Sequence, residues 1–177
     1  MGGIGIAAQI LPAPIGSLTL IGTGAALTEI RFGEQTGSES LEETQVLRLA
    51  AAELTAYFSG ALRVFSIPLS PQGTAFQRVV WQALTDIPYG QTATYGEIAA
   101  MINNPNACRA VGMANNRNPL PIVIPCHRVI GADGRLVGYG GGLGVKEWLL
   151  ELERTVTLND STLPQNQDRL HPGACLV

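Results

Sequence analysis

Glycine and proline divide this sequence into short segments. The chain contains 21 glycines and 11 prolines in 177 residues, about 18% against the ~12% of average proteins. Both residue types interrupt helices and strands, so this content favours short elements joined by many turns. Charged residues make up only 14%, well below the roughly 25% of soluble domains, which excludes disorder for most of the chain. The length suggests one domain, or two small ones that share a core.

The N-terminal segment is uncharged up to Glu29, which raises the question of a signal peptide. It lacks the positively charged start of a secretory signal, and Pro12 and Pro14 interrupt any apolar helix. No window reaches the ~20 unbroken apolar residues of a membrane span. We therefore expect no membrane association and an intracellular protein, located in the cytoplasm or, in a eukaryote, in the nucleus.

The cysteines and histidines are too few for a metal site or a disulfide framework. Cys108, Cys126 and Cys175 form no CxxC pair, and His127 and His171 are the only histidines. An odd number of unpaired cysteines predicts neither disulfides nor structural zinc. We expect no bound metal.

The net charge of −3 argues mildly against a nucleic-acid partner. The distribution of charge along the chain favours such a partner instead. In residues 105–146 one acidic residue, Asp133, accompanies five basic ones: Arg109, Arg117, Arg128, Arg135 and Lys146. This local excess of four positive charges makes the segment a candidate surface for an anionic partner.

Residues 1–70 form one predicted unit. Apolar runs at 4–10, 17–22 and 25–32, separated by proline and glycine, are consistent with a small antiparallel sheet. A helical stripe follows over 41–58, with Gly60 just past its end. No residue in this half carries recognisable chemistry, so we interpret it as a packing scaffold.

The second half, after a linker at 71–73, contains a helix–turn–helix pattern. One helix is predicted from Thr74 to the turn at 88–90. Thr94 and Glu97 then form a capping box that opens a short helix through residue 102. The turn 103–106 follows, and then a helix over 107–116. This spacing is that of a helix-turn-helix motif, although many proteins that bind no DNA also contain two such helices.

The helix over 107–116 combines small residues with arginines. Ala107, Ala110 and Gly112 would let its backbone approach a partner closely, and Arg109 and Arg117 would donate hydrogen bonds to phosphate or to a base edge. The alternative is a helix packed tightly on its neighbour, with the arginines in solvent. The pattern alone does not decide between them.

Cys126 is the strongest candidate for chemistry. It follows an apolar run at 122–124, predicted as a buried strand, and a proline that fixes the backbone. A cationic or hydrogen-bonding environment would lower the thiol pKa from ~8.5 and make it a nucleophile. Side chains alternate along an extended strand, so His127 needs a turn or a bridging water to reach the Cys126 sulfur. The alternative is a buried, inert cysteine beside a structural histidine.

If His127 is a base, a third group should hold its other ring nitrogen. The candidates lie on the helix predicted over 145–153: Glu147, Glu151 and Glu153. The glycine-rich stretch 138–144 before this helix lacks the dinucleotide fingerprint and the phosphate-loop lysine. It is either a rim whose amides approach a polar ligand or a simple loop. After Arg154 the sequence is polar and without pattern, which predicts a loose tail over 155–177.

Four motifs together resemble the O6-alkylguanine-DNA alkyltransferases. They are Pro-Cys-His-Arg-Val at 125–129, Asn118 eight residues before the cysteine, Arg-Ala-Val-Gly at 109–112, and Gly-Gly-Leu at 141–143 leading into Lys-Glu-Trp-Leu-Leu. The resemblance covers residues 74–153, and the N-terminal half matches in general layout only. It implies an α/β (α+β) fold in which the sheet and helix of residues 1–70 pack on a winged helix-turn-helix-like alkyltransferase domain, 74–154.

The resemblance implies direct reversal of DNA alkylation damage. Such proteins move the alkyl group from guanine O6 irreversibly to their own cysteine, once per molecule and without a cofactor. Here Cys126 would be the acceptor and His127 a base acting through water, oriented by Glu153. Tyr95 would protonate the leaving guanine, and Asn118 would brace the active-site turn.

The resemblance also implies the partner: a monomer would bind double-stranded DNA that carries O6-alkylguanine. Arg109 would fill the stack vacated by the flipped base. The other predicted DNA contacts are Ala107, Ala110, Gly112, Arg117 and Arg128. The predicted walls of the guanine pocket are Val129, Tyr139 and Gly140, the last at a position where some members carry serine.

Two other functions compete with alkyl transfer. An alkyltransferase-like damage sensor lacks the acceptor cysteine, whereas Cys126 stands here in an intact motif. A cysteine hydrolase usually brings its histidine from far along the chain, and the only other one here is His171 in the predicted tail. A stable alkyl adduct on the protein distinguishes the transferase from both.

Overall fold

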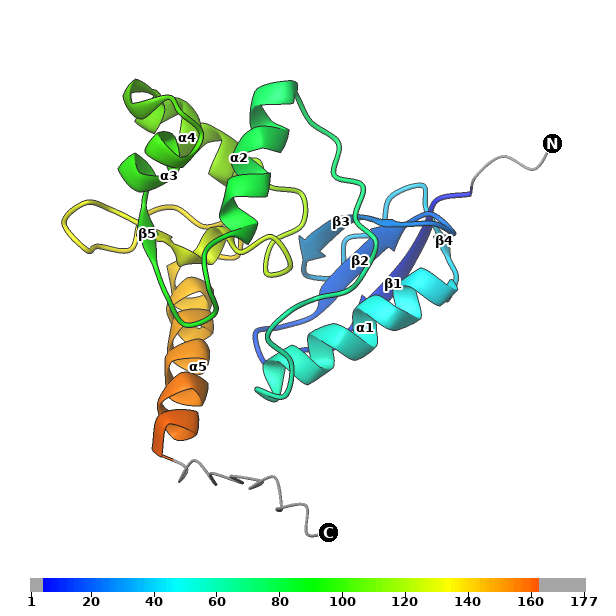
Figure 1. The fold of residues 1–177 in the computed structure, drawn as a ribbon. Helices are drawn as coiled ribbons and strands as arrows, with labels where there is room; N and C mark the ends of the chain where they lie inside the picture. Colours follow the sequence, from blue (N-terminus) through cyan, green and yellow to red (C-terminus); the bar gives the residue numbers. More distant parts are fainter. Residues whose placement is uncertain (1–4, 163–177) are drawn as a thin grey trace, which may run out of the picture.

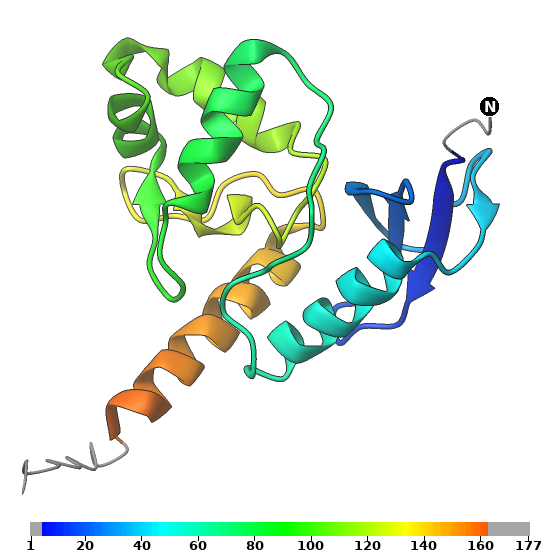
Figure 2. The same ribbon diagram turned by 45° about the vertical axis from the view of Figure 1, so that its right-hand side comes forward.

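The computed structural model describes residues 5–162, which form two lobes (Figures 1 and 2). The first lobe is a four-stranded sheet in the order β3-β2-β1-β4 with one helix, α1, packed on it. Its elements are β1 Ala7–Leu11, β2 Leu18–Gly22, β3 Leu27–Phe32, β4 Ser40–Leu41 and α1 Gln45–Phe58. The three longer strands are antiparallel, as predicted, and β4 pairs parallel to β1.

Helix α1 begins later than residue 41, where the sequence predicts it. Residues Ser40 and Leu41 pair with β1 instead, and Thr44 caps the helix by accepting a hydrogen bond from the Leu47 N–H. The apolar stripe of α1 faces the sheet. Gly60, with φ of 77°, follows the C-cap Ser59.

The second lobe is mainly helical. Its elements are α2 Ala75–Thr85, β5 Ala93–Thr94, α3 Tyr95–Met101, the 3₁₀ turn η1 Pro105–Ala107, α4 Cys108–Asn116, the 3₁₀ turn η2 Cys126–Arg128, β6 Val129–Ile130 and α5 Leu143–Thr162. The capping box predicted at Thr94 is present, and a second one, formed by Thr74 and Gln77, begins α2. The buried Trp81 indole donates to the Ala114 carbonyl at 2.9 Å, which ties α2 to α4.

The prediction of a strand over 122–124 is wrong. The segment forms turns, and Ile122 has φ of 75°, which no strand accommodates. The Asn118 amide holds it by donating to the Ile124 carbonyl at 2.8 Å. An apolar run of three residues cannot distinguish a strand from a buried turn, because both exclude water.

The tail predicted to be loose from residue 155 is helical up to Thr162, since α5 continues past Arg154. Tertiary contacts account for the extension. Val156 packs closely against Gly60, Thr157 lies against Gly90, and Arg63 pairs with Asp160. Residues 163–177 of the predicted tail lie outside the described residues.

The two lobes share one hydrophobic core. The Ile30 N–H of β3 donates to the Pro119 carbonyl at 2.8 Å, and Phe58 contacts Trp148 of α5 with ring centroids 6.1 Å apart. These contacts bring the edge of β3 beside the segment that precedes Cys126. Within residues 5–162, no helix is long and apolar enough to cross a membrane.

Candidate functional site

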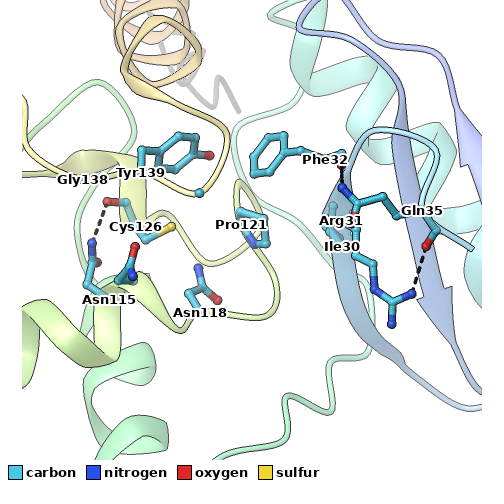
Figure 3. A pocket seen from close by; sticks show the side chains of 12 residues that line it. Ile30, Arg31, Phe32, Gln35, Asn115, Asn118, Pro121, Cys126, Gly138 and Tyr139 are labelled. Carbon is cyan, nitrogen blue, oxygen red and sulfur yellow. Dashed lines mark hydrogen bonds between the residues drawn. The ribbon is translucent and has the colours of Figure 1, made fainter. Parts of the chain in front are cut away.

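Cys126 lies at the wall of a cavity of about 270 Å³ between the two lobes (Figure 3). It is the first residue of η2 and is 4% exposed. The second lobe lines the cavity with Cys126, Asn115, Asn116, Asn118, Pro121, Gly138, Tyr139 and Gly140. The first lobe contributes Ile30, Arg31, Phe32 and Gln35. Residues 1–70 are therefore more than the packing scaffold that the sequence suggests.

Two asparagines hold the turn that presents the thiol. Asn118 donates to the Ile124 carbonyl and accepts from the Leu120 N–H at 3.0 Å. Asn115, buried on α4, donates to the Cys126 carbonyl at 3.4 Å. The contacts of Asn118 are those that the predicted bracing role requires. Sequence reasoning missed Asn115, since nothing in a helix of mixed composition marks one asparagine as inward-facing.

The thiol of Cys126 is protonated at neutral pH. Burial raises its pKa to about 11, although a hydrogen bond with Asn118 and the positive charge of Lys146 both act to lower it. A reaction that needs the thiolate must therefore remove the proton with a base. Lys146 is itself buried, with its ammonium donating to the carbonyls of Val129 at 2.6 Å and Val137 at 2.8 Å.

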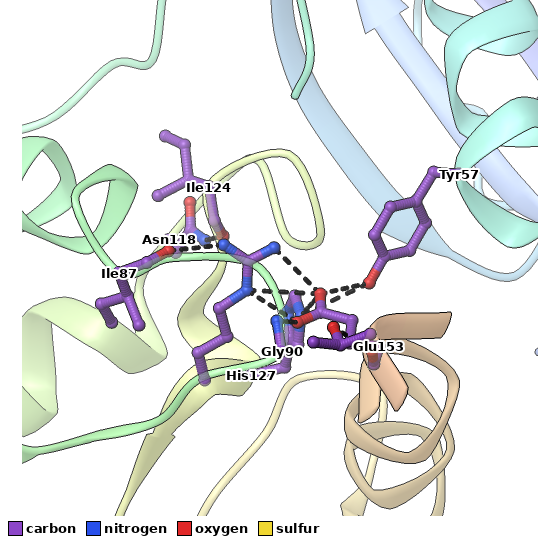
Figure 4. Close-up of polar contacts among 9 residues, drawn as sticks. Tyr57, Ile87, Gly90, Asn118, Ile124, His127 and Glu153 are labelled. Carbon is purple, nitrogen blue, oxygen red and sulfur yellow. Dashed lines mark hydrogen bonds and ion pairs between the residues drawn. The ribbon is translucent and has the colours of Figure 1, made fainter. Parts of the chain in front are cut away.

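His127 meets Glu153 behind the thiol. The two side chains are fully buried, and Nε2 of His127 lies 2.8 Å from Oε1 of Glu153 (Figure 4). Of the three carboxylates considered from the sequence, the one in contact with His127 is the one that the family resemblance names. Glu147 and Glu151 are exposed, and Glu151 pairs with Arg154 instead. All three lie on α5, so the way this helix packs decides which one faces His127.

The charge states of the pair follow from its surroundings. Burial raises the Glu153 pKa, but hydrogen bonds with His127 and Arg128 and the positive charge of Arg128 outweigh it and lower the pKa to about 2. Burial lowers the His127 pKa, against the opposing effect of Glu153. The carboxylate is therefore ionised and the imidazole neutral, with its proton on Nε2 donating to Glu153. The Nδ1 lone pair, buried and without a hydrogen-bond partner among residues 5–162, is left as the basic site.

The side chains of Cys126 and His127 leave the backbone in different directions. The expected extended geometry is wrong here, since both residues belong to a 3₁₀ turn with three residues per turn. Adjacent side chains then diverge by about 120°, neither on one face nor on opposite faces. This geometry is compatible with a bridging water between the thiol and Nδ1.

Arg128 does not contact DNA as predicted, because it points into the protein. It is 6% exposed, and its guanidinium donates to both Glu153 oxygens at 2.9 and 3.0 Å and to the Ile87 carbonyl at 2.7 Å. An arginine within a basic segment of the sequence suggests an exposed charge. Only the buried Glu153 carboxylate makes an inward arginine favourable.

Of the three residues predicted to wall the guanine pocket, two line the cavity. Tyr139 and Gly140 line the cavity, and the Tyr139 ring packs edge-on against Phe32 with centroids 5.6 Å apart. Val129 does not line it: its side chain is buried in the core, because β6 pairs with β5 and turns it inward. Tyr95 is half-buried at the start of α3, with its hydroxyl 3.5 Å from the Val137 carbonyl.

Helix α4 has one packed face and one exposed face. Arg109, Ala110 and Arg117 are exposed, whereas Ala107 and Gly112 are half-buried. A side chain at position 112 would contact the Tyr95 ring. Gly112 thus packs on α3, as the interpretation of a tightly packed helix expects, whereas Arg109, Ala110 and Arg117 lie on the exposed face.

Sequence reasoning also missed Tyr57, which lies in the apolar stripe of α1. Its hydroxyl donates to Oε1 of Glu153 at 2.7 Å (Figure 4). In sequence it is one aromatic residue at a core position, and no local pattern distinguishes it. The Gly90 N–H completes the shell around the carboxylate, donating to Oε2 at 2.9 Å.

The same organisation recurs in known proteins. Residues 75–155 match the family model of the 6-O-methylguanine DNA methyltransferase DNA-binding domain, and residues 7–71 match that of its ribonuclease-like domain. A methylated-DNA–protein-cysteine methyltransferase of Mycobacterium leprae is 51% identical over 157 residues, which cover 86% of this chain and 95% of the relative. The chain belongs to the 6-O-methylguanine DNA methyltransferase family. The resemblance stated from its motifs is confirmed.

Further relatives support the membership. The methylated-DNA–protein-cysteine methyltransferase of Methanosarcina acetivorans is 50% identical over 149 residues, which cover 81% of this chain and 96% of the relative. The crystal structure of Mycobacterium tuberculosis OGT in complex with DNA superposes with a TM-score of 0.79 at 49% identity, covering 85% of this chain and 94% of that one. The expected fold, a sheet domain with a helix joined to a helical DNA-binding domain, is confirmed.

Proposed function

We propose that Cys126 is the residue that accepts the alkyl group in this family member. The protein is a methylated-DNA–protein-cysteine methyltransferase: it binds DNA and repairs O6-alkylguanine by alkyl transfer to a cysteine. The observation that carries the assignment is a buried thiol on the cavity wall, backed by a neutral histidine and an ionised glutamate. The other cysteine among residues 5–162, Cys108, is exposed on α4 and lines no part of this cavity.

The transfer begins with loss of the thiol proton. His127 Nδ1 takes it, through a water molecule, and the imidazolium that forms donates its Nε2 proton to Glu153, whose negative charge stabilises it. The Cys126 sulfur then attacks the alkyl carbon. A carbon–sulfur bond forms as the carbon–O6 bond breaks, and its electron pair goes to the guanine. Tyr95 supplies a proton to the leaving guanine, and the thioether that remains is stable, so each molecule reacts once.

The guanine must leave the duplex to reach this thiol. We infer that α4 lies against double-stranded DNA and that Arg109 occupies the space of the extruded base, with Arg117 and Ala110 beside it. The exposed arginines of this helix and its short side chains support the inference. Tyr139 and Gly140 then enclose the flipped base. One copy of the chain carries every group used here, in keeping with a monomer, which acts where the genome lies, in the cytoplasm or a nucleus.

Mass spectrometry tests the assignment. The protein is incubated with duplex DNA that contains O6-methylguanine, and peptides are then searched for the added methyl group. We expect one methyl group, on Cys126. Cys126→Ser should bind the DNA and take up none, because a hydroxyl gives up its proton far less readily than a thiol and so cannot replace the thiolate. Methylation of the serine variant, of Cys108, or repeated turnover would contradict the proposal.

A further inference from the structure

One polar contact joins the first lobe to the active site. Tyr57 extends from α1 and is fully buried, with its hydroxyl 2.7 Å from Oε1 of Glu153 and 3.5 Å from Nε2 of His127 (Figure 4). Its ring is held on several sides, with centroids 5.5 Å from Phe65 and 6.0 Å from Tyr89. The hydroxyl therefore has little freedom to move away from the carboxylate.

The hydroxyl is a permanent donor. Burial and the negative charge of Glu153 both raise the Tyr57 pKa far above its ordinary range, so the phenol keeps its proton from pH 5 to 9. Oε1 of Glu153 accepts a hydrogen bond from Tyr57 and another from His127. Of the donors to Glu153 among the described residues, Tyr57 alone comes from the first lobe; the others are His127, Arg128 and Gly90.

We propose that Tyr57 is a positioning residue for alkyl transfer. It fixes the Glu153 carboxylate and weakens the stabilisation that this carboxylate gives to protonated His127. The proposal rests on the proposed function, since it assumes that His127 is the base. The ribonuclease-like lobe thereby supplies part of the proton-transfer apparatus, although the cysteine and the exposed arginines of α4 lie in the other lobe.

The direction of the effect follows from the shared oxygen. A hydrogen bond from Tyr57 withdraws charge from Oε1 and makes it a weaker acceptor for the Nε2 proton. Without that bond the carboxylate stabilises the imidazolium more strongly, and the His127 pKa rises. Alkyl transfer needs neutral His127, so its rate falls on the acid side of this pKa. Loss of the Tyr57 hydroxyl therefore moves the acid limb of the pH–rate profile to higher pH.

The loss also holds the carboxylate less firmly. Arg128 still donates to both oxygens and Gly90 to Oε2, but Oε1 loses the donor that fixes it from the side of α1. A His127 that is oriented less firmly lowers the plateau rate, by about tenfold for one hydrogen bond to a charged group.

The test compares Tyr57→Phe with Tyr89→Phe, which removes the same atom from the neighbouring ring. The Tyr89 hydroxyl has no hydrogen-bond partner within residues 5–162, so its loss should change neither the acid limb nor the plateau of the pH–rate profile. Single-turnover transfer from duplex O6-methylguanine is measured from pH 5 to 9, with urea unfolding at each end of the range. We expect Tyr57→Phe to lower the plateau about tenfold and to shift the acid limb upward, while the protein stays folded.

Two further variants separate positioning from simple packing. In a Glu153→Gln background, Tyr57→Phe should not shift the limb further, since the carboxylate through which it acts is gone. Should Tyr57→Phe fail to fold, 3,5-difluorotyrosine at position 57 keeps the shape and strengthens the donor, and the limb should then move to lower pH. A plateau loss with an unmoved limb, or no effect at all, would overturn the proposal. Failure of the proposed function is distinct, because wild-type Cys126 would then carry no methyl group.

Discussion

Replacing Arg128 with methionine should destabilise the fold while leaving the DNA-binding surface intact. Methionine fills a similar length of buried space but removes the guanidinium from both Glu153 oxygens and from the Ile87 carbonyl. The Glu153 carboxylate would then remain buried with only its hydrogen bonds from His127, Tyr57 and Gly90. Breaking a buried pair by removing one partner leaves an undercompensated charge, which is costly.

The pKa of Glu153 sets the magnitude. It is about 2 in the folded protein against an ordinary 4.5, and at ~1.4 kcal/mol per pH unit this difference corresponds to about 3 kcal/mol of stability at neutral pH. His127 shares in the effect, so we expect Arg128→Met to lower the free energy of unfolding by about 2–4 kcal/mol. Because the folded pKa is depressed, this stability is complete above about pH 5 and is lost as pH falls toward 2. The variant should lose less stability over that range than the wild type.

Urea unfolding at pH 7, followed by circular dichroism, measures the loss, and fluorescence anisotropy with an undamaged duplex measures DNA affinity. Arg117→Met is the matched control, since Arg117 is exposed at the C-terminal end of α4. It should change stability by less than about 0.5 kcal/mol and weaken DNA binding. An Arg128→Met protein with wild-type stability and reduced DNA affinity would refute the buried role and restore the contact predicted from sequence.

Two further variants test the proposed mechanism. Glu153→Gln should slow alkyl transfer by the folded protein about tenfold to a hundredfold, which is part of the rate enhancement that positioned acid–base groups supply. Glu147→Gln, at an exposed position, should leave the rate unchanged. Single-turnover rates measure both, and a slow Glu147 variant would refute the orientation of His127 by Glu153. Arg109→Ala should slow repair in duplex DNA by a factor that corresponds to part of the few kcal/mol that unstacking a base costs. The same variant should react almost normally with free O6-benzylguanine, if the protein accepts that base. Equal losses on both substrates would exclude a role in holding the stack open.

Local patterns in the sequence were sufficient to predict an element wherever the interactions that form it join residues close together in the chain. The capping box predicted at Thr94 depends on residues three apart, and it appears in the structure. The antiparallel strands of the first lobe follow from apolar runs between turns. The end of α5 did not follow, because residues 155–162 are helical through contacts with Gly60 and Arg63, which lie far earlier in the chain.

The candidate site divides along the same line. The sequence by itself determined the thiol, the adjacent histidine and the bracing asparagine, because these groups lie close together in the chain and form a motif. The family resemblance also named Glu153 as the partner of His127, and the structure places the two side chains in contact. Only the tertiary structure decided that Arg128 turns inward and that Tyr57 and Phe32 from the first lobe complete the site. The physical reason is burial. A charged or hydroxyl group is favourable inside the protein only beside its partner, and folding brings that partner from 25 to 96 residues away.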